Sequence, residues 1–386
     1  MDENEMNLAT LLTHDDAYPA GSITPPIYQS SLFAFSDYDT MIERFEGKSE
    51  SSLYSRVDNP TVKILEKKIA ALEKGEACIA FSSGMAAISN AILSVVHPGD
   101  KIVCVNHVYP DAYRFLRGFC TRFGMNVEFV DGESLEQVEA AIKDAKLLYL
   151  ESPNSWVMGE QNLLAISELA KKYGVVTAID NSWASPVFQN PIELGIDIVI
   201  HSASKYLSGH SDVVAGLVIS SKKYITQIKQ NISPFLGGKL SAFEAWLIIR
   251  GLRTLKIRMQ QHQESALHIA KKLLDHPCVT NVMHPALLND PNSKLSGYSG
   301  LFAIEVIEGV NVKAFCNALT LFRMGVSWGG YESLVMPAIS VLNQEGEFNS
   351  AKDFGVTPTT IRMSIGLEDM DDLYDDLNNA LTVATQ

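Results

Sequence analysis

The chain has 386 residues, of which 46% are apolar, and a net charge of −14. This length exceeds what one hydrophobic core usually fills, so we expect two domains. The acidic balance opposes phosphate backbones and anionic lipids, so we expect neither nucleic acid nor a membrane as a partner.

The chain shows no targeting, membrane or metal signal. No apolar stretch approaches the ~20 residues of a membrane span, and the start MDENEMN lacks the basic region of a signal peptide, which indicates a cytoplasmic protein. The cysteines lie in apolar contexts without a CxxC pair, so we expect reduced core residues and no metal. They are Cys78, Cys104, Cys120, Cys278 and Cys316.

Residues 1–58 are rich in Ser, Pro and Asp and show little periodicity. This composition predicts an arm rather than a domain. Within it, the segment LYSRVDNP contains Tyr54 and Arg56. An arginine there could bind a phosphate through two hydrogen bonds, although an isolated arginine is more often a solvated charge.

Between residues 59 and 255, apolar β-type runs alternate with helix-period segments, which predicts an α/β domain with a mostly parallel sheet. Ser134 and Gln137 form a capping-box pattern at the start of one helix, and another helix should end at Gly174. The expected strands are residues 77–81, 101–105, 126–130, 146–150, 175–179 and 196–200.

Two features after these strands are compatible with a bound cofactor. The sequence SSGMAA at 82–87 follows a strand and opens a helix, so its free N–H groups could cradle a phosphate. Alone, it would more often be a tight turn without a ligand. Tyr109 follows the next strand, where its ring could stack on a planar cofactor or only pack in a loop.

Asp180 and Lys205 follow two neighbouring apolar runs, and Ser202 and Ser204 come just before the lysine. Buried parallel strands place such residues at the carboxyl edge of a sheet, where α/β proteins bind ligands. Either residue alone would more often be a turn cap or a surface charge. Together they suit pyridoxal 5'-phosphate, which needs an amine, an anion at its ring nitrogen and donors at its phosphate.

After residue 255 the pattern changes to a long helix at 258–276, a strand candidate at 299–306 and an acidic helix at 369–384. This order predicts a smaller C-terminal α+β domain covering residues 256–386.

Over nearly its whole length the chain resembles the pyridoxal-phosphate enzymes of cysteine and methionine metabolism. The resemblance implies the fold of PLP-dependent transferases (fold type I, aspartate-aminotransferase-like), with a mostly parallel central sheet. The stretches that carry it are ITPPIYQSS, YSRVDNPT, FSSGMAAI, LESPNS, IDNSWASPVFQNPIELGIDIVIHSASKYLSGHSDVVAG, IIRGLRTLKIRMQQHQESA and IRMSIGLEDMDDL.

The resemblance also implies roles for individual residues. Lys205 would form the Schiff base with the cofactor, Asp180 would pair with the ring nitrogen, and Tyr109 would stack on the ring. Arg362 would bind the substrate α-carboxylate, helped by the segment of Ser327. The phosphate ligands within the chain would be Gly84, Met85, Ser202 and Ser204.

Family members also share sites between subunits. Tyr54 and Arg56 would reach the phosphate of the neighbouring subunit, so the resemblance implies an active dimer that pairs into a homotetramer.

Within the family, the pattern is most similar to bacterial cystathionine β-lyases. Trp328 in SWGGYESL and Trp183 in DNSW carry this similarity. Val326 replaces the Glu of many cystathionine γ-lyases and γ-synthases, but Val there also occurs in methionine γ-lyases. Ser155 replaces a common Asn, as in the β-lyases, and Ser204 replaces the commoner Thr.

The activity expected from this resemblance is β-elimination of L-cystathionine to homocysteine, pyruvate and ammonia, with Tyr109, Ser327, Trp328 and Arg362 contacting the substrate. Two enzymatic alternatives stay open: a γ-elimination lyase acting on methionine, cystathionine or another γ-substituted amino acid, and a cystathionine γ-synthase. A non-catalytic regulatory protein on the same fold is a remote alternative.

Overall fold

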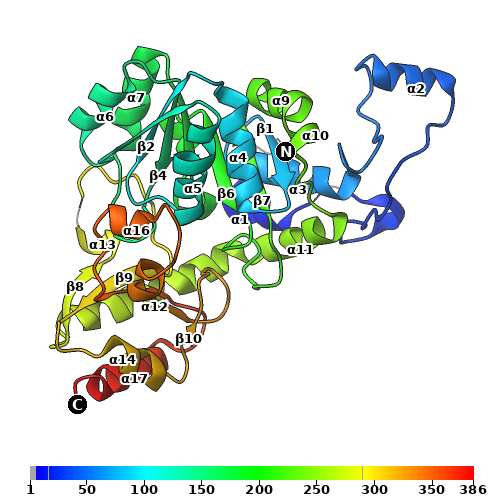
Figure 1. The fold of residues 1–386 in the computed structure, drawn as a ribbon. Helices are drawn as coiled ribbons and strands as arrows, with labels where there is room; N and C mark the ends of the chain where they lie inside the picture. Colours follow the sequence, from blue (N-terminus) through cyan, green and yellow to red (C-terminus); the bar gives the residue numbers. More distant parts are fainter. Residues whose placement is uncertain (1–5, 16, 289) are drawn as a thin grey trace.

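The computed structural model describes residues 6–15, 17–288 and 290–386. Its strands form one seven-stranded and one five-stranded sheet. Figure 1 shows the first sheet enclosed by helices, with the long helix α12 (Leu255–Leu274) running below it toward the second sheet. In the described part of the chain, no helix is both long and apolar enough to cross a membrane. All five cysteines are buried and unpaired.

The seven-stranded sheet has the order β1-β7-β6-β5-β4-β2-β3. The strands from β3 to β6 are parallel, whereas β7 is antiparallel to both β6 and β1. The mostly parallel α/β sheet expected from the sequence is therefore confirmed. The strands are β1 (Ala77–Phe81), β2 (Lys101–Val105), β3 (Asn126–Val130), β4 (Leu147–Glu151), β5 (Val176–Asp180), β6 (Ile198–Ser202) and β7 (Gly216–Ser220).

All six strands expected in this part of the chain form, with three shifted by one or two residues. The strand β7 is additional: the loop after β6 leads directly into it, without the intervening helix that the alternating pattern implied. Because no helix crosses over, the chain returns antiparallel to β6.

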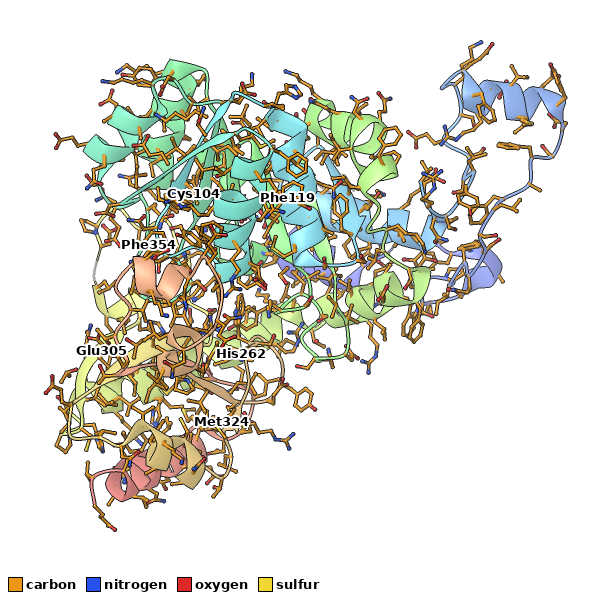
Figure 2. The ribbon with its side chains drawn as sticks, viewed as in Figure 1. Cys104, Phe119, His262, Glu305, Met324 and Phe354 are labelled. Atoms are coloured by element: carbon orange, nitrogen blue, oxygen red, sulfur yellow. The ribbon has the colours of Figure 1, made fainter. Side chains whose placement is uncertain are left out.

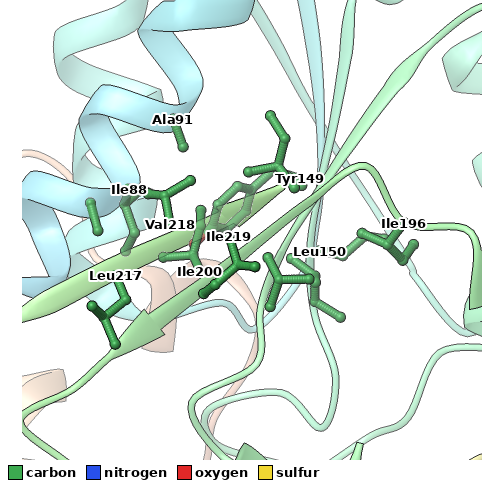
Figure 3. Packing of buried hydrophobic residues seen from close by; sticks show 14 of the residues in the cluster. Ile88, Ala91, Tyr149, Leu150, Ile196, Ile200, Leu217, Val218 and Ile219 are labelled. Carbon is green, nitrogen blue, oxygen red and sulfur yellow. The ribbon is translucent and has the colours of Figure 1, made fainter. Parts of the chain in front are cut away.

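Helices cover both faces of this sheet, and α4 packs on β6 and β7. Ile88 and Ala91 of α4 lie above Ile200 and Val218 in the core (Figure 3). The helices in this part are α3 (Pro60–Leu72), α4 (Gly84–Val95), α5 (Pro110–Arg114), the π-helix η3 (Phe115–Cys120), α6 (Leu135–Ile142), α7 (Leu163–Tyr173), α8 (Ser185–Phe188), η4 (Pro191–Leu194), α9 (Lys222–Asn231), α10 (Ser233–Leu236) and α11 (Ala242–Leu252).

The helix-end signals are confirmed only in part. Gly174 ends α7 with a left-handed φ of 69°, as expected. At α6, the Ser134 hydroxyl accepts from the Gln137 N–H, but the Gln137 side chain accepts from the backbone N–H of Asp131. The predicted capping box at Ser134 is therefore wrong in its second half, because the preceding turn presents a different donor to Gln137.

The five-stranded sheet has the order β10-β11-β12-β9-β8 and packs against α12 and α17. The long helix, the strand near 299–306 and the acidic final helix expected from the sequence all form. The elements after α12 are β8 (Val279–Met283), α13 (Pro285–Leu288), β9 (Leu301–Val306), α14 (Val312–Ala318), β10 (Arg323–Met324), β11 (Leu334–Pro337), α15 (Ala338–Leu342), α16 (Ser350–Asp353), β12 (Thr360–Ser364) and α17 (Met370–Val383).

The N-terminal segment contains α1 (Leu8–Thr13), the 3₁₀ turn η2 (Pro19–Gly21) and α2 (Tyr38–Phe45). The helix α2 lies apart from the body of the chain (Figure 1), and its N-cap Asp37 accepts from the Thr40 N–H at 2.8 Å. The little periodicity noted in this segment did not predict these short helices. The expected boundaries at residues 58 and 255 stay predictions.

The packing of β4 gives a stability prediction. Leu150→Ala should destabilise the fold by about 2–5 kcal/mol, since Leu150 is fully buried in the sheet core and the change leaves a cavity. Urea unfolding followed by circular dichroism measures this. Leu164→Ala is the control, because Leu164 is 42% exposed on α7 and should cost much less. Equal losses in both variants would contradict the packing described.

Candidate active site

Acidic and hydroxyl side chains gather at the carboxyl edge of the parallel strands. β4 ends with Glu151, β5 with Asp180 and β6 with Ser202, and Glu151 pairs in register with Asp180. The strands are apolar because both of their faces are covered, so the polar residues lie where the strands leave the core. Lys205 follows in the turn after β6. The structure thus brings together the residues that the two apolar runs predicted.

The turn between β1 and α4 forms an anion cradle beside this edge. Ser83 caps α4 by accepting from the Ala86 N–H at 3.0 Å. The N–H groups of Gly84 and Met85 precede the first hydrogen bond within the helix, so they lie free of helical partners. A Cβ atom at Gly84 would lie 3.1 Å from the Ser202 hydroxyl oxygen. This close approach gives a phosphate group both backbone and hydroxyl donors.

Ser204 lies differently from Ser202. Its hydroxyl accepts from the Ala215 N–H at 2.9 Å and donates to the Ala215 carbonyl at 3.3 Å. The backbone N–H of Ser202 donates to the Ser182 hydroxyl at 2.6 Å, which leaves the Ser202 side chain to face Gly84. Ser204 therefore shapes the turn after β6, and its role as a phosphate ligand stays a prediction.

The Lys205 amine is held by the C-terminal region. Its Nζ donates to the Ser327 hydroxyl at 2.5 Å and lies 5.2 Å from the Trp328 ring centroid. Burial and, to a smaller extent, the charge of Arg362 lower the pKa of Lys205 to about 8, although the charge of Asp180 partly opposes them. A substantial neutral fraction near physiological pH makes this amine a competent nucleophile and base.

Asp180 is buried, and its Oδ1 accepts from the Ser182 N–H at 2.9 Å. Burial raises the pKa of Asp180, while hydrogen bonds from Ser182 and the charges of His201 and Lys205 lower it. A cation placed against this carboxylate would offset its desolvation. This is the environment that a protonated ring nitrogen needs.

Glu151 is a site residue that sequence reasoning missed. It is buried, and its Oε2 accepts from the Tyr109 backbone N–H at 2.7 Å. Burial raises the pKa of Glu151 well above its usual value, and the negative charge of Asp180 raises it further. The available signal was the run LLYLE, in which an acidic residue ends a buried strand as Asp180 does.

Tyr109 is the N-cap residue that precedes α5, and it is 40% exposed. Its hydroxyl donates to the Asp111 Oδ2 at 2.9 Å. Burial of the phenol raises the pKa of Tyr109 well above its usual value, and the charge of Asp111 adds to this rise. The backbone of Tyr109 is held by Glu151, which lies in register with Asp180, so the ring is placed beside the edge that carries Asp180.

Arg362 lies in β12 and is buried. Its guanidinium donates to the Val326 carbonyl at 3.2 Å and, at a weak 3.5 Å, to the carbonyl and hydroxyl of Ser155. It also lies 5.1 Å from the Trp156 ring centroid. Burial lowers the pKa of Arg362 to about 10, and the charge of Glu151 opposes this. Because its neutral partners are weak, this cation suits a carboxylate ligand.

The two tryptophans of the sequence pattern differ in their surroundings. Trp183 is buried, and its Nε1 donates to the Leu301 carbonyl of β9 at 3.0 Å. It therefore joins the two sheet regions. Trp328 instead covers Lys205 and lies 5.5 Å from the ring of Tyr206. Only Trp328 contacts a predicted catalytic group.

Tyr54 and Arg56 lie next to α10 of their own chain. Within the described residues, Arg56 donates to the Pro234 carbonyl at 3.4 Å and lies 5.8 Å from the Tyr54 ring centroid. Both residues are exposed. Their predicted contact with the phosphate of a neighbouring subunit stays a prediction.

A phosphate cradle, a buried lysine with a lowered pKa and a buried aspartate at the carboxyl edge of such a sheet define a pyridoxal-phosphate enzyme of fold type I. Comparison with known proteins agrees. The model of the family described as "Cys/Met metabolism PLP-dependent enzyme" matches residues 9–382. The chain belongs to this family, and its cofactor is pyridoxal phosphate.

The chain is similar to several characterised members. It is 35% identical over 376 residues to the L-methionine gamma-lyase of Pseudomonas putida, covering 95% of this chain and 94% of that protein. It is 35% identical over 367 residues to the cystathionine beta-lyase of Lactococcus lactis subsp. cremoris, covering 94% of each. The structure of cystathionine gamma-lyase from Lactobacillus plantarum complexed with L-serine matches with a TM-score of 0.90 and 34% identity, covering 98% of this chain and 99% of that one.

The position of Lys205 predicts the outcome of its removal. Lys205→Ala should abolish turnover and the visible absorbance of the lysine-bound cofactor while the protein stays folded, because the amine acts chemically and contributes little packing. Absorbance spectra, steady-state assays and circular dichroism measure these three properties. Lys172→Ala is the control, since Lys172 lies exposed on α7 and pairs with Glu139. More than a trace of residual turnover would show that Lys205 is not the base.

The charges around Lys205 predict a pH dependence. The amine must be neutral to attack the cofactor aldehyde, so recombination of the apo-protein with pyridoxal phosphate should be slow at low pH and accelerate with a midpoint near pH 8. Arg362→Met removes a positive charge that lowers the pKa of Lys205, so the midpoint should move to higher pH. Stopped-flow absorbance measures it. An unchanged or lower midpoint in Arg362→Met would contradict the proximity of the two cations.

Proposed function

We propose that this enzyme cleaves the C–S bond of L-cystathionine by β-elimination and releases homocysteine, pyruvate and ammonia. The observation that carries this proposal is the contact of the segment 326–328 with Lys205. Ser327 binds the amine, Trp328 covers it, and the carbonyl of Val326 binds Arg362. The segment 326–328 thus fixes the position of Lys205, the proposed base, relative to Arg362, the proposed receptor of the substrate carboxylate.

Each residue of the site has a task in this reaction. Arg362 binds the substrate α-carboxylate and thereby orients Cα toward Lys205, which removes the Cα proton. Asp180 keeps the cofactor ring nitrogen protonated, and Tyr109 covers the ring. Pyridoxal phosphate, when bound, withdraws electrons from Cα and so supplies the stabilisation that this proton removal needs. The Cβ–S bond then breaks, and the thiolate leaves with the bonding electrons and takes up a proton to give homocysteine. The released three-carbon enamine reacts with water to give pyruvate and ammonia.

Two features favour β- over γ-elimination. β-Elimination requires the removal of one proton at Cα, whereas γ-elimination requires a second proton removal at Cβ. Ser327 and Trp328 hold the Lys205 amine at one place, which favours a base with a single target atom. Val326 is aliphatic and 77% exposed, so the segment carries no carboxylate for the distal amine of cystathionine, which counts against γ-elimination of cystathionine but not of methionine.

γ-Elimination of methionine or cystathionine is the second candidate function. It is favoured by the names of similar proteins, which include the L-methionine gamma-lyase of Porphyromonas gingivalis at 38% identity over 372 residues. Cystathionine γ-synthesis is a further alternative within the family. All three reactions begin with the same Cα proton, so the residues that bind the cofactor serve each of them equally.

The proposal includes an assembly of identical subunits. Tyr54 and Arg56 are exposed and so accessible to a second subunit, which supports a shared site in a dimer that pairs into a homotetramer. A cytoplasmic location stays a prediction from the sequence.

The products of L-cystathionine test the proposed reaction. Cleavage on the three-carbon side yields pyruvate and homocysteine, whereas cleavage on the four-carbon side yields 2-oxobutyrate and cysteine. We expect pyruvate to dominate when the purified enzyme is incubated with L-cystathionine and the oxo acids are separated by chromatography. The Lys205→Ala protein provides the blank. Predominant 2-oxobutyrate, or its fast release from methionine with little turnover of cystathionine, would replace the β-lyase with the γ-lyase.

A further inference from the structure

The hydroxyl of Tyr109 begins a chain of polar contacts that leaves the active site. It donates to the Asp111 Oδ2 at 2.9 Å, and the other oxygen of Asp111 accepts from the Arg114 guanidinium at 2.6 Å. All three residues lie in or next to the short helix α5, which begins at Pro110. Arg114 thereby fixes the carboxylate that the tyrosine hydroxyl uses as its acceptor.

Arg114 also contacts the C-terminal region. Its second terminal nitrogen donates to the Gln344 Oε1 at 2.5 Å, and its Nε donates to the Phe348 carbonyl at 3.4 Å. These partners are more than two hundred residues away in sequence. The chain of contacts therefore runs from Tyr109 through Asp111 and Arg114 to residues 344 and 348.

The same segment packs against α5 at a second place. The Tyr113 hydroxyl donates to Asp353, and the ring of Phe354 lies 5.4 Å from the ring of Tyr113 and 5.8 Å from that of Phe129. Figure 2 shows Phe354 where the C-terminal region meets the seven-stranded sheet. Residues 344–354, hereafter the α16 segment, thus lie against α5 through both polar and aromatic contacts.

We propose that Asp111 is a positioning residue that orients the Tyr109 hydroxyl, and that Arg114 couples this orientation to the α16 segment of the C-terminal region. The proposal rests on the function proposed for Tyr109 as the residue that covers the cofactor ring. It goes beyond that function because the α16 segment, which lies outside the cofactor site, would influence the orientation of the Tyr109 ring. When the α16 segment moves relative to the seven-stranded sheet, the acceptor of the Tyr109 hydroxyl moves with it.

The charges that face Tyr109 predict in which direction the pKa of its hydroxyl changes when the Asp111 charge is lost. Asp111 and two carboxylates of the sheet edge, Asp180 and Glu151, are negative and favour the protonated phenol. Arg362 is the cation that interacts with the phenol from β12. Loss of the Asp111 charge removes one of these negative groups together with the acceptor that it provides, so the Tyr109 hydroxyl should ionise at lower pH.

A half-exposed ion pair without a further role would behave differently. The Asp111 and Arg114 side chains are 47% and 33% exposed, and such pairs usually contribute little to stability. Arg114→Met, which keeps the Asp111 charge, would then change neither the titration of Tyr109 nor the α16 segment. A positioning role and a simple ion pair can therefore be distinguished without an activity assay, by the ionisation of Tyr109 and by the amide hydrogen exchange of residues 344–354.

The first experiment measures ionisation of Tyr109 in the full-length holoenzyme. Tyrosinate absorbance is titrated in the wild-type and Asp111→Asn proteins, and the titration of the same protein carrying Tyr109→Phe is subtracted from each. We expect the Tyr109 signal to begin at lower pH in Asp111→Asn, which keeps an oxygen acceptor but loses the charge, within the alkaline range in which circular dichroism shows both proteins to be folded. Asp144→Asn is the control, because Asp144 is exposed and pairs with Lys101 at the other end of the sheet.

The second experiment measures the coupling to the C-terminal region. Arg114→Met replaces the aliphatic part of the arginine by a similar unbranched chain but removes the guanidinium contacts to Asp111 and Gln344. We expect faster amide hydrogen exchange in peptides covering residues 344–354 and unchanged exchange in α17. Unchanged exchange in 344–354 would overturn the coupling. An unchanged Tyr109 titration in Asp111→Asn, or an equal shift in Asp144→Asn, would overturn the positioning role.

Neither experiment depends on which products the enzyme forms. If cystathionine gave 2-oxobutyrate, the β-lyase proposal would fail while the Tyr109 titration and the exchange of residues 344–354 could still follow the expected pattern. Conversely, pyruvate formation together with an unchanged titration would leave the β-lyase in place and remove Asp111 from its positioning role.

Discussion

The active site depends on the burial of four charged groups, three at the carboxyl edge of the seven-stranded sheet and one on β12 of the five-stranded sheet. Lys205, Asp180, Glu151 and Arg362 all lose most of their water, and each loss is unfavourable for the charged form. Two cations and two carboxylates offset one another in charge. The balance of burial and charge leaves Lys205 with a pKa of about 8 and raises the pKa values of Asp180 and Glu151. Such a site suits a ligand that carries both positive and negative charge.

This balance requires both sheets. The seven-stranded sheet supplies the lysine and the carboxylates, whereas Arg362 comes from β12 and Ser327 from the loop before β11. The hydrogen bond from Trp183 to Leu301 and the long helix α12 hold the two parts together near the site. Without the C-terminal region, the amine of Lys205 would lose its hydroxyl partner Ser327, and the site would lose the buried cation Arg362.

The residues suited to the cofactor and the residues around the Lys205 amine bear on different properties of the enzyme, the first on cofactor binding and the second on the proposed reaction. The cradle at α4 and the edge carboxylates meet the needs of pyridoxal phosphate, which every member of the family shares. Under the proposed function, the choice of the bond that breaks depends on the groups around the Lys205 amine, among them Ser327 and Trp328. For this reason the fold and the cofactor follow from the comparisons, while the reaction is a proposal that needs its own test.

The sequence by itself determined the strands and the residues that end them. Buried parallel strands are continuous apolar runs, so Asp180 and Lys205 could be placed at one edge, and Gly174 could be placed at a helix end. The tertiary structure decided β7, the hydrogen bond from Tyr109 to Glu151, and the contact of Lys205 with a serine 122 residues away. Periodicity is a local property of the chain, whereas such partners depend on how distant loops pack, which no local pattern encodes.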